Sequence, residues 1–369
     1  MTAEPKVLFE VRSVISGGFI ALATLNSEKT LNALSLEMVD LLYPQLKLWE
    51  QDHSIHCVIL NGAGTKAFCA GGDVRRVAEE KLTLDSVNHS YALEFFTKEY
   101  QLDYLIHTYK KPIIVWAHGI VMGGGIGLLA GASHRIVTET TYWAMPEITI
   151  GLYPDVGGTY FLNRAPQGLG LFMGLTGAAG NAADALFLQL ADRVMKQEYF
   201  SVVIDQLIQL NWSAFDSANT AINSVLRPLT LKELPESNCW KNYFLLRELV
   251  DEEGIIAITQ KILNYATTDT WLMKAQKNLS SGCPTTAHIV YEQLKRGTHL
   301  SLKACFQLEL ILSLQCVLQG DFSEGVRALL IDRDQTPHWH YENIKSVPRQ
   351  KVLDHFNAPW VGAHPLVDL

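Results

Sequence analysis

Short apolar runs alternate with amphipathic segments along the first half of the chain. Residues 19–25 form an almost continuous apolar run, and residues 36–50 place Met38 and Leu42 at helical spacing behind Ser35, a residue type that often begins a helix. Because parallel strands joined by helices give this alternation, we predict an α/β domain with a largely parallel sheet. The predicted strands are residues 7–11, 19–25, 57–60, 113–117 and 135–137, and the predicted helices are residues 36–50, 73–80, 93–108 and 125–132.

The pattern changes after Pro154, where helical segments follow one another without strands between them. A polar stretch that contains Pro228 and Pro235 interrupts these helices, and the last part of the chain has four prolines and two tryptophans. We therefore predict an α/β core over residues 1–210, a connector over 211–240, a helical C-terminal region over 241–331 and an extended tail over 332–369.

Composition and charge exclude several classes of function. The net charge is −8 and no Lys/Arg-rich run is present, so we expect no nucleic-acid partner. The six cysteines contain no C-x-x-C pair, which argues against a zinc knuckle or a redox pair. We see no targeting segment at the N-terminus and no stretch of eighteen apolar residues, so we expect a cytoplasmic protein without a membrane segment.

Two glycine-bearing turns are candidates for a binding site. One is KAFCAGGD at residues 66–73 and the other is HGIVMGGGIG at residues 118–127; each leads into a predicted helix. Small residues let a ligand approach the backbone, and the start of a helix offers unpaired N–H donors. Two such turns together could form an oxyanion hole, although each taken singly is better explained as a tight turn.

Two carboxylates lie in an apolar stretch further along the chain. Glu147 and Asp155 belong to MPEITIGLYPDVGG, between prolines and glycines. Apolar surroundings raise the pKa of a carboxyl group and suit it to acid or base catalysis. Taken alone, Asp155 is better explained as the cap of a following helix, and Glu147 has no preferred explanation.

These three motifs, in this order, resemble the crotonase (enoyl-CoA hydratase/isomerase) superfamily. The resemblance covers about residues 7–194 and implies a ββα spiral fold, here followed by a helical C-terminal region. It also implies that two backbone N–H groups polarise the thioester carbonyl of an acyl-CoA. By position, those donors would be Gly72 and Gly124.

Departures from the common pattern point to one branch of the family. Hydratases carry a glutamate where this chain has Gly127, whereas Asp155 stands where they commonly have glycine. Together with the FFTKEY segment, which contains Glu99, this arrangement resembles the 3-hydroxyisobutyryl-CoA hydrolase branch. The resemblance implies hydrolysis of a 3-hydroxyacyl-CoA, foremost 3-hydroxyisobutyryl-CoA in valine catabolism. Glu147 would be nucleophile or general base, Asp155 would assist, and Glu99 would bind the substrate's polar end.

The same resemblance leaves alternatives open. An enoyl-CoA isomerase could work with Glu147 alone, and a hydratase would need a second carboxylate elsewhere. A more remote alternative is an RNA-binding relative, which would require the basic patch that this chain lacks. No metal or redox cofactor is expected, because CoA is part of the substrate. A homo-oligomer is possible by analogy with the family.

Overall fold

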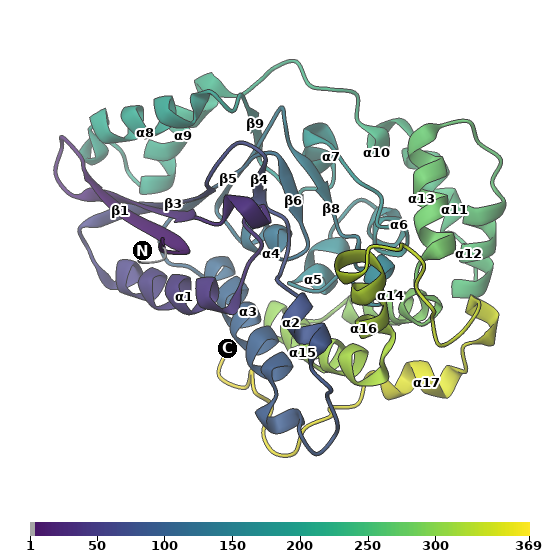
Figure 1. Ribbon diagram of the computed structural model, residues 1–369. Coiled ribbons are helices and arrows are strands. Elements are labelled where there is room, and N and C mark those ends of the chain that lie inside the picture. Colours follow the sequence, from purple (N-terminus) through teal and green to yellow (C-terminus); the bar gives the residue numbers. More distant parts are fainter. Residues whose placement is uncertain (1–3) are drawn as a thin grey trace. The chain divides into compact units, whose positions relative to one another are not determined.

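The computed structural model describes residues 4–369 and divides into two compact units, each assembled from three stretches of chain (Figure 1). Unit 1 contains the described residues up to Gly72, together with Leu102–Trp143 and Gly180–Ser237. Unit 2 contains Asp73–Gln101, Ala144–Ala179 and Asn238–Leu369. The units interleave along the chain, so they do not test the four consecutive segments expected from the sequence, which remain a prediction.

A parallel sheet forms the centre of unit 1. Within residues 4–369 the sheet has six strands in the order β1-β2-β3-β5-β7-β9, of which β1 and β2 pair antiparallel and the others pair in parallel. A smaller sheet follows the order β4-β6-β8. The strands are β1 (Val7–Ser13), β2 (Phe19–Leu25), β3 (Ile55–Gly62), β4 (Ala67–Cys69), β5 (Ile113–Ala117), β6 (Ile120–Met122), β7 (His134–Thr138), β8 (Tyr142–Ala144) and β9 (Arg193–Met195).

Three times along the described chain, a strand of the large sheet leads into a strand of the small sheet and then into a helix. β3 and β4 are followed by α2 (Arg75–Glu79), and β5 and β6 by α4 (Gly124–Ala130). β7 and β8 are followed by the 3₁₀ helix η3 (Glu147–Ile150). This repeat is the ββα unit that the sequence predicted, and each candidate motif lies at the end of one such unit.

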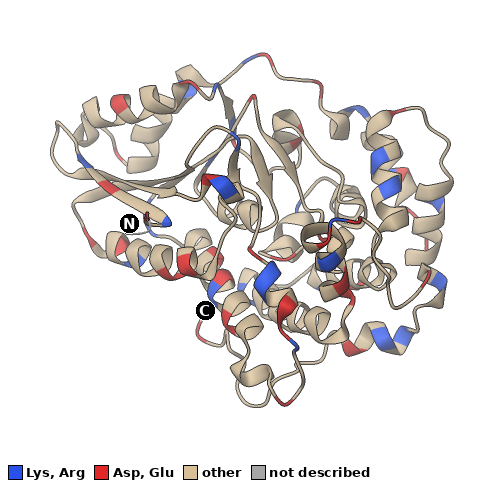
Figure 2. Ribbon diagram, viewed as in Figure 1, with Lys and Arg blue, Asp and Glu red and all other residues tan. Residues whose placement is uncertain are grey.

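Two amphipathic helices cover one face of the large sheet in unit 1. The helices are α8 (Tyr199–Gln209) and α9 (Ala218–Leu229) (Figure 1). Their apolar side chains pack with sheet residues such as Ile59 and Trp116. In Figure 2 the red and blue residues lie mainly on helices and loops, as expected for strands covered in this way. Unit 1 also contains α1 (Leu36–Gln51), α4 and α7 (Ala182–Phe187).

Within residues 211–240, the segment that the sequence predicts to be a connector, the structure has the helix α9. The side chain of Ser217 caps this helix by accepting a hydrogen bond from the N–H of Thr220. The polar outer face of α9 and Pro228, near its C-terminal end, made the segment resemble a loop. Its apolar residues nevertheless recur at helical spacing and are buried.

Unit 2 is mainly helical, and its central helix is α15 (Leu302–Gln319). This helix is long and apolar enough to cross a membrane, but more than half of it is buried within the protein, as in a core helix. The other helices of the unit are α5 (Gly158–Leu162), α6 (Leu169–Thr176), α10 (Asn238–Lys241), α11 (Tyr243–Leu249), α12 (Ile255–Asn264), α13 (Thr270–Ser281), α14 (Pro284–Gly297), α16 (Asp321–Val326) and α17 (Arg349–Asp354), while α3 (Tyr91–His107) belongs to both units.

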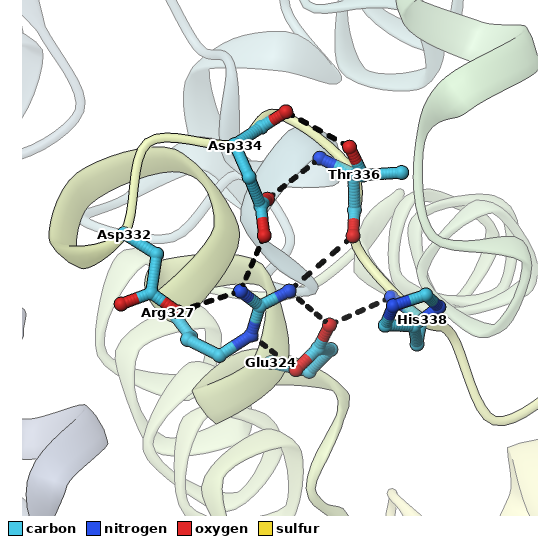
Figure 3. Close-up of polar contacts among 6 residues, drawn as sticks. All are labelled: Glu324, Arg327, Asp332, Asp334, Thr336 and His338. Atoms are coloured by element: carbon cyan, nitrogen blue, oxygen red, sulfur yellow. Dashed lines mark hydrogen bonds and ion pairs between the residues drawn. The ribbon is translucent and has the colours of Figure 1, made fainter.

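Arg327 holds the start of the C-terminal tail (Figure 3). Its guanidinium donates to the carboxylates of Glu324, Asp332 and Asp334 at 2.6 to 2.9 Å, and Glu324 also accepts from the backbone N–H of His338. The tail, predicted to be extended, contains the short helix α17 and a 3₁₀ turn at Ile344–Ser346. Local carboxylate–arginine pairing, rather than aromatic packing alone, fixes its course.

The helix α16 packs directly against η3. A Cβ atom added to Gly325 would lie 2.4 Å from the carbonyl carbon of Ile150, and one added to Gly151 would lie 2.5 Å from the carbonyl oxygen of Asp321. Only glycine permits so close an approach of two backbones. The C-terminal helices therefore set the position of the segment that carries Glu147.

We predict that Gly325→Ala destabilises the protein by about 1–3 kcal/mol, because the added methyl group forces α16 away from η3. Urea denaturation followed by circular dichroism measures this loss. Ser323→Ala on the same helix adds no atom and serves as the control. Equal stability of the two variants would contradict the described packing.

Candidate active site

The two glycine turns lie next to each other in unit 1. They follow the parallel neighbours β4 and β6, so both leave the same end of the small sheet. A Cβ atom on Gly125 would lie 2.4 Å from the carbonyl oxygen of Cys69, and one on Gly71 would lie 3.4 Å from that of Met122. The turns are therefore in close backbone contact, which explains the glycines at these positions.

Gly124 is buried and Gly72 is half-buried in these turns. Gly124 is the first residue of α4, so its N–H has no acceptor within the helix. The neighbouring Gly71 has a φ of 108°. Its carbonyl accepts a hydrogen bond from the Leu34 N–H, and this contact does not involve the Gly72 N–H. Two N–H donors on adjacent turns match the requirement for binding one oxyanion.

In unit 2, Glu147 and Asp155 are both buried, at 5% and 4% exposure. Glu147 is the first residue of η3, whose backbone is held by a hydrogen bond from the Cys283 N–H to the Ile148 carbonyl. Asp155 precedes a turn in which Val156 and Gly157 both have positive φ angles. A non-glycine residue in this conformation is uncommon and frequently marks a functional turn.

The Asp155 side chain does not cap the following helix, so the explanation that its position alone favoured is wrong. The first turn of α5 is instead bound by Glu309 of α15, whose two carboxylate oxygens accept from the N–H groups of Gly157 and Thr159, both at 2.8 Å. The Asp155 carboxyl group is therefore not needed to bind the first turn of α5. The Glu309 carboxyl is fully buried, and burial raises its pKa to about 8.

Glu99 and Tyr100, which belong to the helix α3, lie close to Asp155. The Tyr100 hydroxyl lies 2.7 Å from Oδ2 of Asp155, and Glu99 is 2% exposed. Among residues 4–369, neither Oε1 of Glu99 nor Oε2 of Glu147 has a hydrogen-bond partner, although both atoms are buried. Buried carboxylate oxygens without partners are costly and are typical of a site that awaits a ligand.

Burial controls the ionisation of these groups. It raises the pKa of Glu99 and Glu147 well above the usual range, and the nearby Asp155 raises both further. Burial likewise raises the pKa of Asp155 to about 6. Three neighbouring carboxyl groups in a low-dielectric site do not all ionise together, so the cluster retains a proton near neutral pH. Over the described residues, no group of His, Cys, Asp or Glu is arranged to hold a metal ion.

Sequence reasoning missed the polar residues that support this cluster, namely Tyr153, Glu309 and Ser313. The Ser313 hydroxyl lies 2.6 Å from that of Tyr100 and 2.7 Å from that of Tyr153. Glu309 and Ser313 are four residues apart on the mostly apolar helix α15, so they share one face. Two polar residues at this spacing in an apolar helix were the available signal.

The sequence profile of the enoyl-CoA hydratase/isomerase family matches residues 20–356. The chain belongs to this family. It is therefore a member of an acyl-CoA enzyme family, as the motifs predicted, and the crotonase-like α/β fold with a helical C-terminal region is confirmed. An acyl-CoA substrate is expected for members of the family.

Curated relatives of this crotonase cover most of the chain. It is 36% identical over 347 residues to a Xenopus tropicalis protein and 35% identical over 346 residues to a Homo sapiens protein, both named 3-hydroxyisobutyryl-CoA hydrolase, mitochondrial. Each match covers 92% of this chain and 87% of the relative. These names overturn the expectation of a cytoplasmic protein. Reduced cysteines and an acidic composition do not distinguish the cytosol from other reducing compartments.

Two solved crotonase structures resemble this one over nearly its whole length. A carnitinyl-CoA dehydratase from Mycobacterium thermoresistibile has a TM-score of 0.84 and 30% identity, and the match covers 96% of this chain and 97% of that one. An enoyl-CoA hydratase from Rhodobacter sphaeroides 2.4.1 has a TM-score of 0.79 and 30% identity, with 94% and 96% covered. The C-terminal helices therefore belong to the shared fold.

We predict that the Glu309 contribution to stability falls as the pH rises from 5 to 8. The folded protein holds a proton on Glu309, whose pKa is about 8, whereas the unfolded chain releases it near the usual value of 4.5, so rising pH favours unfolding. One such group contributes at most about 1.4 kcal/mol per pH unit. Urea denaturation across this range should show a shallower slope for Glu309→Gln.

Glu292 provides the matched control. Its pKa is lowered, against the opposing effect of burial, by the Arg349 guanidinium, so its carboxyl is ionised in both states above pH 5. Glu292→Gln should keep the slope of the wild type. A Glu309→Gln variant whose slope equals that of the wild type would contradict the assignment of a retained proton.

Proposed function

We propose that this protein hydrolyses 3-hydroxyisobutyryl-CoA to 3-hydroxyisobutyrate and CoA, a step in valine catabolism. The observation that carries the proposal is the buried cluster of Glu99, Glu147 and Asp155, in which two carboxylate oxygens have no partner among the described residues. A hydroxylated acyl group would supply the missing hydrogen bond. The names of the curated relatives support the same substrate.

The mechanism that we propose divides the work between backbone and side chains. The N–H groups of Gly72 and Gly124 bind the thioester carbonyl oxygen and stabilise the negative charge that develops on it. Glu147 either attacks the carbonyl carbon, forming a mixed anhydride that water then cleaves, or removes a proton from the attacking water. In both routes the carbon–sulfur bond breaks, a carbon–oxygen bond forms and the sulfur gains a proton. These steps need no cofactor besides the CoA of the substrate.

Asp155 and Glu99 determine the choice of acyl group in this proposal. Both lie at the polar end of the cluster, where the Tyr100 hydroxyl already contacts Asp155. A substrate 3-hydroxyl that binds there relieves the unpartnered Oε1 of Glu99. An acyl group without this hydroxyl would leave the carboxyl groups buried and unpaired, which is the strongest basis for rejecting a close analogue.

Addition of water to an enoyl-CoA is the second candidate function, because the two structural relatives are named as a hydratase and a dehydratase. In this chain Gly127 lies in the buried helix α4 and offers no carboxylate there. Glu99 is the second carboxyl group that could take part. A competition between 3-hydroxyisobutyryl-CoA and an enoyl-CoA separates the two reactions.

We predict that Glu147→Gln lowers kcat/KM for CoA release from (S)-3-hydroxyisobutyryl-CoA at least about a hundredfold, because the amide is neither a nucleophile nor a base. Release of free thiol, followed with a thiol reagent, measures it. Glu94→Gln changes an exposed carboxylate on the helix that carries Glu99 and should leave the rate unchanged. Full activity in Glu147→Gln would refute the role of Glu147.

We predict that isobutyryl-CoA, which lacks only the 3-hydroxyl, is hydrolysed up to about 10⁴-fold less efficiently by the wild type. Glu99→Gln should narrow this ratio, because it removes the buried carboxyl group whose unpartnered Oε1 the substrate hydroxyl would contact. The comparison uses kcat/KM for both thioesters in both proteins. Equal efficiency of the two thioesters in the wild type would contradict hydroxyl recognition.

A further inference from the structure

A chain of buried hydroxyl groups connects Asp155 to the backbone of α15. The Asp155 Oδ2 atom lies 2.7 Å from the Tyr100 hydroxyl, which lies 2.6 Å from the Ser313 hydroxyl. Ser313 in turn lies 2.7 Å from the Tyr153 hydroxyl, which donates to the backbone carbonyl of Glu309. All five residues belong to unit 2 and are fully or almost fully buried.

The number of protons in this chain depends on Asp155. The hydroxyl chain has four oxygen–oxygen contacts, and each contact needs one hydrogen. A carboxylate and a carbonyl only accept hydrogen bonds, so the hydroxyls of Tyr100, Ser313 and Tyr153 must supply every hydrogen when Asp155 is ionised. Three hydroxyl protons cannot fill four contacts. With Asp155 ionised, one pair of oxygens in the middle of the chain faces each other at hydrogen-bond distance without a proton.

A proton on Asp155 removes this deficit. Asp155 then donates to Tyr100, Tyr100 donates to Ser313, Ser313 donates to Tyr153, and Tyr153 donates to the Glu309 carbonyl. Each contact has one hydrogen, and every hydroxyl donates once and accepts once. An unfilled contact between buried polar atoms costs free energy comparable to that of a lost hydrogen bond, so the chain favours the protonated acid.

We propose that this hydroxyl chain favours a proton on Asp155 in the free protein, and that Ser313 and Tyr153 are positioning residues that raise its affinity for the proton through Tyr100. Burial acts in the same direction and is the largest cause of the raised pKa of Asp155, whereas hydrogen bonds from the Tyr100 hydroxyl and the Asp155 backbone N–H lower this pKa. The titratable groups that face it are Glu99 and Tyr100 on α3, Glu147 on η3, Tyr153 in the loop, and Glu309 and Cys316 on α15.

The catalytic meaning of this proton rests on the function proposed above, whereas its presence does not. Burial is the largest cause of the raised pKa of Glu147, and the Asp155 charge raises it further; a neutral Asp155 removes this second contribution and so favours the ionised Glu147 that acts on the thioester. Asp155 can then give its proton to the departing sulfur and become a carboxylate. Rotation of the Tyr100 hydroxyl stabilises this carboxylate, and the proton of the attacking water restores the acid.

The decisive test is the titration of Asp155 in Tyr153→Phe, by ¹³C NMR of protein labelled at the aspartate carboxyl carbons. Asp155→Asn identifies the resonance. In Tyr153→Phe two contacts remain and two hydroxyl protons fill them, so the deficit disappears and ionised Asp155 is fully hydrogen-bonded. We expect the pKa of Asp155 to fall by about one pH unit, and to fall similarly in Ser313→Ala.

The alternative is that Asp155 is ionised, and it predicts a change of the pKa in the other direction. If Ser313 only strengthens donation from Tyr100 to an ionised Asp155, its removal weakens that bond and the pKa of Asp155 rises. Tyr109→Phe, which removes a hydroxyl that donates to the Leu46 carbonyl in unit 1, is the control and should leave the titration unchanged. A pKa that rises or stays constant in Tyr153→Phe overturns the proposal. Because the titration requires no substrate, the proposal can fail while CoA release is present, or hold while it is absent.

Discussion

The desolvation of carboxyl groups is the constraint on which unit 2 depends. Glu99, Glu147, Asp155 and Glu309 are all buried, and no ion pair between any of them and a lysine or arginine side chain is found over residues 4–369. Burying a charge without a partner is expensive, so such groups retain protons or receive hydrogen bonds. Glu309 receives two backbone N–H groups, Asp155 contacts a hydroxyl, and the other two keep free oxygens.

The helix α15 organises this arrangement. Glu309 binds the turn that follows Asp155, and Ser313, one helical turn later, contacts both tyrosines beside it. The neighbouring α16 fixes the segment of Glu147 through contacts that only Gly151 and Gly325 allow. The C-terminal helices therefore do more than extend the α/β core, because the conformation of both catalytic candidates depends on them. Unit 1 contributes a different feature, a pair of backbone turns kept in contact by glycine.

Sequence patterns predicted the parts of the molecule that depend on local chemistry. Alternating apolar runs located the strands, and the glycines of residues 66–73 and 118–127 identified two turns that are packed together. The hydroxyl chain was not predictable, because Tyr100 and Ser313 are separated by 213 positions and only the tertiary fold brings them together. The helix α9 was missed because its polar face resembled a connector. Asp155 resembled a helix cap, a role that Glu309 performs from a distant helix.

The central claim is that this crotonase cleaves a thioester and does not add water to a double bond. The most direct measurement is a competition in which the wild type receives (S)-3-hydroxyisobutyryl-CoA and crotonyl-CoA in one vessel, and mass spectrometry follows all products. The account predicts free CoA and 3-hydroxyisobutyrate, with crotonyl-CoA left unchanged. Conversion of crotonyl-CoA to its hydrated form, without release of CoA from either thioester, would contradict it.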